Sequence, residues 1–288
     1  MAEGEQRRGE PAPMGARDVT VEHPRGHGHD QARTGLFRIA LGVQVLAAGF
    51  FGLFPYLAPA DFARAFGLAG DEPYLLRLAG AATIGYAVSA LIGLIRGSWM
   101  SLRIPIASTF TFNVTAAAAS LVAIDETGLA PLPVLVGIAA SAFATISAYW
   151  LWRNEGPADA GGATFEPGFR LTQAAATVVA SAIGLWELLL PRAFASLFDL
   201  SPADLVIIRL AGAATLGLGV AGLLSLIVDH WPAIRIQTIA AITSNVAVAI
   251  ASAIYLAQGG RSILGVLFLL ASGFLVLSLT AWAARAER

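Results

Sequence analysis

Eight predominantly apolar stretches, each about as long as a bilayer core is thick, constrain this chain more than any other feature. They cover residues 36–57, 74–95, 103–124, 131–152, 170–190, 204–228, 233–257 and 262–283. A helix needs roughly 20 apolar residues to cross the hydrocarbon core, and a spanning segment there must satisfy its own backbone hydrogen bonds. The sequence therefore predicts an all-α membrane protein with eight transmembrane helices.

Composition agrees with a membrane protein and excludes several kinds of chemistry. The chain is 57% hydrophobic and 13% charged, whereas soluble domains have about 45–50% apolar and about 25% charged residues. It has no cysteine, and all 18 basic residues are arginine, which excludes thiolate nucleophiles, iron–sulfur clusters and a retinal-type Schiff base. The net charge of −1 provides no basic surface for nucleic acid. We expect no cofactor and no nucleic-acid partner.

Polar segments divide the chain into two membrane units. Residues 1–34 are rich in Gly, Pro, Arg and Glu, which predicts a disordered tail that is too long before the first apolar run to be a signal peptide. Its stretch HPRGHGHD (23–30) is weak evidence for a metal site, and we expect none. Charges, glycines and prolines at 154–168 predict a linker between a first unit, 35–153, and a second, 169–288.

The two units repeat each other at an offset of 132 residues. The heptapeptide RLAGAAT occurs at 77–83 and again at 209–215. The same offset aligns other informative residues without a gap, among them Phe37 with Phe169, Phe62 with Phe194, Trp99 with Trp231, Asn113 with Asn245 and Trp150 with Trp282. Matches of this kind predict a tandem duplication.

The number of spans in each unit predicts how the repeats are related. Because each unit contains an even number of spans, both enter the membrane from the same side, which predicts parallel repeats related by a pseudo-twofold axis along the membrane normal. Nine arginines near helix ends lie on the side of the termini and five on the opposite side. The positive-inside rule therefore predicts a multi-pass protein of the cell membrane with both termini in the cytoplasm.

Arg77 and Arg209 open the repeated heptapeptide inside predicted spans. Steps of four residues from each arginine pass through small residues, first Ala81 and Gly85 and then Ala213 and Gly217 in the second copy, which is typical of close helix packing in lipid. A helix start is predicted at residues 201–204. Two interpretations of the arginines stay open, a structural role and a site for an anion or lipid headgroup. The threonines that end the heptapeptide, Thr83 and Thr215, are further candidates for ligand or packing contacts.

Apart from Asp204, the first residue of its span, Glu187 is the one acid that falls within a predicted span. A charge inside the membrane is costly and is usually paired, so we predict an ion pair between Glu187 and Arg209. The first unit has Pro55 at the equivalent position. Arg77 must therefore use another partner, and the candidates are Asp61, Asp125, Glu126, a carbonyl, a lipid phosphate or a ligand.

Asn113 and Asn245 lie near the middle of their spans. Amides at this depth need partners because lipid offers none. They either connect neighbouring helices or line a polar cavity between the two repeats.

The segments 61–73 and 192–204 each place two phenylalanines one turn apart. This spacing favours a short amphipathic helix in the outer interface, and the alternative is a lid over a site beneath it.

A short turn with two phenylalanines, followed by an arginine and a Gly/Ala-rich helix in a four-span unit, resembles small bacterial four-helix membrane proteins of the DoxX-like kind. The likeness is carried by Phe62, Phe66, Gly67, Leu68, Arg77, Gly80 and Gly85, and again by Phe194, Phe198, Leu200, Arg209, Gly212 and Gly217, with Asp199 departing from the pattern. The resemblance covers both repeats and implies a fold in the bacterial inner membrane. It implies no activity, because that group is largely of unknown function.

Three functions follow from these patterns. The first is binding or transport of a small neutral, lipid-like or anionic ligand between the two repeats. The second is an accessory or structural subunit that packs against other membrane proteins or itself. The third is an intramembrane enzyme that acts on a lipid or isoprenoid, with Glu187 as general acid. A single carboxylate makes a poor catalytic set for such an enzyme.

Overall fold

The computed structural model describes residues 35–68, 72–154, 165–200, 205–228 and 230–287. Eight of its helices are long and apolar enough to cross a membrane, as predicted, and two short helices, α2 and α7, complete the set. The predicted tail, its histidines and the helix start at 201–204 lie outside the described residues. The helices are α1 Gly35–Leu57, α2 Pro59–Phe66, α3 Pro73–Arg96, α4 Trp99–Thr127, α5 Pro131–Arg153, α6 Pro167–Leu189, α7 Pro191–Leu197, α8 Leu205–Val228, α9 Trp231–Ala257 and α10 Ile263–Ala286.

Local sequence signals account for several helix ends. Proline occupies the first position of α2, α3, α5, α6 and α7, where its fixed φ suits a helix and its missing N–H costs no hydrogen bond. Ser98 caps α4 through a reciprocal capping box with Ser101. Gly67 ends α2 in the left-handed conformation with φ of 64°, which glycine adopts without steric cost.

The long helices pack first as antiparallel pairs. In the first unit α1 packs on α3 and α4 packs on α5, and in the second unit α6 packs on α8 and α9 packs on α10. The same pairs therefore recur at equivalent positions of the two units. The duplication and its twofold axis themselves stay predictions.

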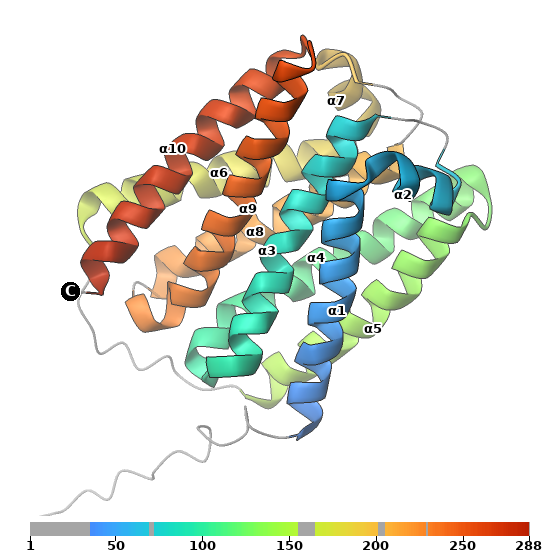
Figure 1. Ribbon diagram of the computed structural model, residues 1–288. Coiled ribbons are helices and arrows are strands. Elements are labelled where there is room, and N and C mark those ends of the chain that lie inside the picture. The colour runs from blue at the N-terminus through green and yellow to red at the C-terminus, as the bar shows by residue number, and fades with distance from the viewer. Residues whose placement is uncertain (1–34, 69–71, 155–164, 201–204, 229, 288) are drawn as a thin grey trace, which may run out of the picture.

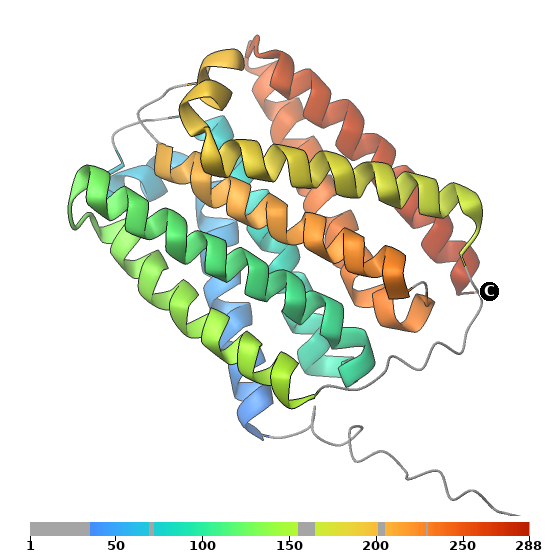
Figure 2. The same cartoon turned by 180° about the vertical axis from the view of Figure 1, so that it is seen from behind.

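The central contacts of the bundle are made between the two units. Helix α4 packs on α8 and α9 packs on α3, much more extensively than α3 packs on α4 or α8 on α9. Figure 1 shows α3 between α1 and α9, and Figure 2 shows α8 between α6 and α4. Each unit thus places one helix hairpin against the other unit, which the sequence did not predict.

The predicted seams of small residues are confirmed at these two crossings between the units. Ala81 and Ala213 are fully buried. A Cβ on Gly85 would lie 3.0 Å from the carbonyl oxygen of Ala240, and one on Gly217 would lie 2.8 Å from the carbonyl oxygen of Ser108. Such spacing leaves room for hydrogen only, so the glycines set the distance between the helices.

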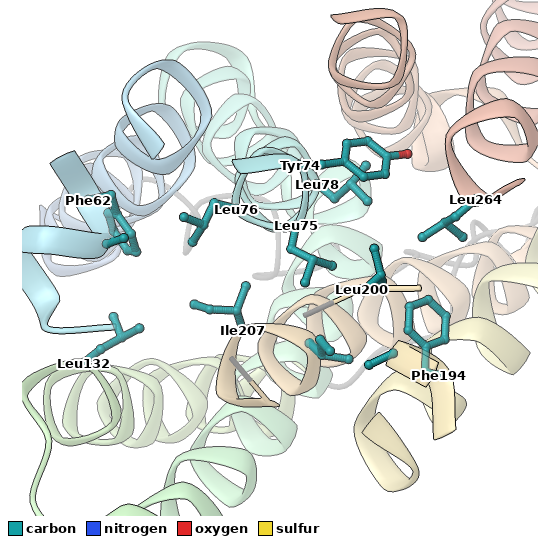
Figure 3. Packing of buried hydrophobic residues seen from close by; sticks show 13 residues of the cluster. Phe62, Tyr74, Leu75, Leu76, Leu78, Leu132, Phe194, Leu200, Ile207 and Leu264 are labelled. Atoms are coloured by element: carbon teal, nitrogen blue, oxygen red, sulfur yellow. The ribbon is translucent and has the colours of Figure 1, made fainter. Parts of the chain in front are cut away.

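The short helices α2 and α7 cover one end of the bundle, called the α2–α7 end below. Phe62 and Phe194 are 3% and 1% exposed and belong to one buried cluster with residues of α3, α5, α8 and α10. Figure 3 shows Phe62, Leu132 and Ile207 converging there from three elements. Short helices are therefore present at both predicted segments, and the first phenylalanine of each is buried inside the protein; their placement in the membrane interface stays a prediction.

Candidate functional site

Arg209 forms an ion pair with Glu126, at the α2–α7 end of the bundle. Its two terminal nitrogens donate to the two carboxylate oxygens over 2.7 and 2.8 Å, and the Arg209 side chain is only 10% exposed. This bidentate geometry is the strong form of an arginine–carboxylate contact. The predicted pair of Glu187 and Arg209 is wrong, because the packing of α4 on α8 brings the end of α4 to the arginine.

Glu187 lies instead within the crossing of α6 and α8. Its side chain is 5% exposed, and its Oε2 has no hydrogen-bond partner among the described residues. Its Cβ lies against Gly212, since a Cβ added there would be 2.7 Å away. The carboxyl is therefore closed in by packing, which gives a general acid no path to a substrate.

A cavity of about 110 Å³ lies within the first unit. It is lined by residues of α1 to α5, together with Ile207 and Leu210 of α8. Phe62 of α2 lies at one end, and α1 and α5 form two of its sides without packing extensively on each other. The volume approaches the roughly 150 Å³ of an engineered apolar cavity that binds benzene.

Most of the lining is apolar, but a polar cluster lies near the middle of α1 and α4. The Gln44 side-chain N–H donates to Thr109 Oγ1 over 3.0 Å, and the Asn113 side-chain N–H donates to the Thr109 carbonyl over 2.8 Å. The side-chain oxygens of Gln44 and Asn113 accept no hydrogen bond from the described residues. The cluster therefore offers two free amide acceptors inside a largely apolar space.

Two further polar residues of the lining are already occupied. The Tyr86 hydroxyl donates to the Ala214 carbonyl over 2.8 Å and accepts from Ser108 Oγ over 3.3 Å. Thr83 Oγ1 donates to the carbonyl of Ala79 within its own helix over 2.8 Å. Tyr86 thus connects the cavity wall to α8. Because the Thr83 hydroxyl is used within its own helix, its methyl group is the part left to contact a ligand.

The equivalent positions of the second unit do not preserve the polar cluster. The 132-residue offset replaces Gln44 by Ala176, Tyr86 by Leu218 and Thr109 by Ala241, whereas Val136 becomes the larger Phe268. The glutamine, tyrosine and threonine of the first unit therefore have no polar equivalent in the second.

The two asparagines do not share a cavity. Asn245 donates to the carbonyl of Ala241 in its own helix over 2.8 Å and is not part of the lining, and Thr215 is not part of it either. This cavity is therefore not one lined by both amides, although Ile207 and Leu210 of the second unit contribute to its wall. Gln44 and Thr109 were not predicted as site residues. The sequence did contain an indication, because Gln44 lies inside an apolar span and the equivalent residue of the second unit is alanine.

Comparison with protein-family models, with curated proteins and with solved structures found no match. The resemblance to DoxX-like proteins stays a prediction.

Proposed function

We propose that this integral membrane protein binds a small neutral molecule in the cavity of the first unit. The molecule is mostly apolar and carries one hydroxyl group, which donates its proton to the free amide oxygen of either Gln44 or Asn113. The observation that carries the proposal is the polar cluster at one end of an otherwise apolar cavity.

The lining favours a neutral ligand over an ion. No arginine, aspartate or glutamate is among the residues that line the cavity, and an unpaired charge in such surroundings is strongly unfavourable. A hydroxyl group instead gains a hydrogen bond that the lipid chains do not offer, and the apolar remainder of the molecule replaces lipid contacts with protein contacts.

Access from the membrane fits the arrangement of the helices. The cavity is partly open, with α1 and α5 on two of its sides, whereas Phe62 packs into the buried cluster at the α2–α7 end. A ligand dissolved in the bilayer would enter between α1 and α5. We further propose that the α2–α7 end faces away from the cytoplasm, on the strength of the arginine distribution.

The proposal is tested with photoreactive probes on the full chain in lipid nanodiscs. A short aliphatic alcohol and the matched alkane, both carrying a diazirine, are crosslinked, and the labelled peptides are identified by mass spectrometry. We expect the alcohol to label α1, α4 and α5 more strongly than the alkane does, and Gln44→Leu to lower that preference roughly tenfold, the value of one good hydrogen bond.

A cavity-filling variant and a matched control separate the cavity from the lipid-facing surface. Val136→Phe introduces the residue that the second unit has at the equivalent position and should reduce labelling by both probes. Val178→Phe makes the same change on α6, where the side chain is 67% exposed, and should alter neither. Unchanged labelling in Val136→Phe would refute the proposal.

A further inference from the structure

Two equivalent helix crossings are held at the α2–α7 end by different chemistry. Where α4 packs on α8, Arg209 pairs with Glu126 through both nitrogens. Where α9 packs on α3, Tyr74 stacks on Tyr255 with ring centres 4.3 Å apart and shares a 3.0 Å hydrogen bond with Ser252. The second crossing is therefore held by aromatic stacking and a neutral hydrogen bond instead of an ion pair.

The repeat leaves an arginine at the crossing that has no ion pair. Arg77 occupies the position equivalent to Arg209, and Gln258 the position equivalent to Glu126. Arg77 is partly buried, and within the described ranges its guanidinium has no hydrogen bond or ion pair. Asp61, one of the predicted candidates for a partner of Arg77, is paired with Arg64 over 3.2 Å. The α3–α9 crossing therefore contains the arginine of the repeat but lacks the carboxylate that Glu126 provides at the α4–α8 crossing.

We infer that Arg77 binds a phosphate group at the α3–α9 crossing, in the place that the Glu126 carboxylate takes at the α4–α8 crossing. A guanidinium holds phosphate as it holds carboxylate, through two parallel hydrogen bonds. Arg77 is the fifth residue of α3 and lies near the end of the bundle, at the depth where lipid headgroups meet a spanning helix. The phosphate belongs either to an anionic lipid or to a free anion.

The Tyr56 hydroxyl adds a polar neighbour to this position. It lies close enough to Arg77 for an electrostatic interaction and donates its proton to the carbonyl of Ala247 in α9 over 2.9 Å. The hydroxyl proton is therefore used within the protein. Arg77 is therefore the residue that would bind the negative charge of a phosphate at this site.

The decisive variant supplies the missing carboxylate from the protein itself. Gln258→Glu copies the pairing of Arg209 onto Arg77, at a position that is exposed and so tolerates the change. Arg77→Gln removes the cation. Arg64→Gln is the matched control, because its side chain is 78% exposed at the same end of the molecule and it loses the same charge.

Binding is measured on the full chain in detergent by native mass spectrometry with phosphatidylglycerol, with phosphatidylcholine as the zwitterionic reference, and by thermal unfolding with inorganic phosphate. We expect Gln258→Glu and Arg77→Gln each to weaken phosphatidylglycerol binding roughly tenfold, with Arg64→Gln close to the unmodified chain. A phosphate-dependent rise in Tm that both variants abolish identifies a free-anion site, and its absence with lipid binding intact identifies a headgroup site.

Two results would overturn the inference. One is equal phosphatidylglycerol binding and an equal response to phosphate in the unmodified chain and in Gln258→Glu. The other is a loss in Arg64→Gln as large as that in Arg77→Gln, since it would attribute the effect to net charge. If Arg77→Gln does not fold, Gln258→Glu decides alone, because it keeps the arginine.

Discussion

The close approach of α6 and α8 should not tolerate one added methyl group. At the crossing of α6 and α8, a Cβ on Gly212 would lie 2.7 Å from Glu187 Cβ and from the Leu188 backbone nitrogen, and 2.8 Å from the Gly184 carbonyl oxygen. Two of these three atoms are backbone. They cannot turn away as the end of a side chain can, so Gly212→Ala must move the helices apart.

The size of the effect follows from two opposing terms. Ordinary contact begins at 3.4 Å, so the crossing has to open by about 0.7 Å, and overpacking of this kind costs about 1–3 kcal/mol. Replacing glycine by alanine inside a helix returns up to about 1 kcal/mol. We expect Gly212→Ala to lower the free energy of unfolding by about 1–2 kcal/mol.

Gly49→Ala in α1 is the matched control, because nothing lies within 4 Å of its added Cβ. Here only the helix term operates, and stability should stay the same or rise by up to about 1 kcal/mol. The assay is unfolding of the purified chain in mixed micelles by increasing SDS, followed by the loss of helical circular dichroism. If Gly212→Ala proves as stable as Gly49→Ala, the packing distance assigned to this crossing is wrong.

Three further outcomes follow from the buried polar groups, all measured in the same unfolding assay. Glu126→Gln should cost about 2 kcal/mol, less than a fully buried pair because the carboxylate is 35% exposed, and a double-mutant cycle with Arg209→Gln should show positive coupling; additive losses would contradict the pair. Glu187→Leu should leave stability unchanged or raise it by about 1–3 kcal/mol, because a buried carboxyl oxygen without a described partner is removed; a large loss would mean that the carboxyl has a partner. Tyr86→Phe should cost about 1 kcal/mol, since the Ala214 carbonyl loses its donor, and an unchanged midpoint would argue against that hydrogen bond.

The cavity shows where prediction from sequence reached its limit. Asn113 was recognised as a polar residue in the middle of a span and does line the cavity, whereas Asn245, its equivalent, does not. The amide of each residue bonds to a carbonyl four residues earlier in its own helix, so the local signal is the same for both. The difference arises from the neighbouring helices, which leave a cavity beside Asn113 in the first unit.

The eight spanning helices and the seams of small residues could be predicted because both are local properties of the chain. A bilayer fixes the length of an apolar helix, and small residues four positions apart mark a close approach whichever helix packs there. The exchange of hairpins between the units, the partner of Arg209 and the position of the cavity required the tertiary structure. In lipid a helix is apolar on all sides, so hydropathy does not indicate which of its faces meets which neighbour, and only the packing of α4 on α8 and α9 on α3 settled these points.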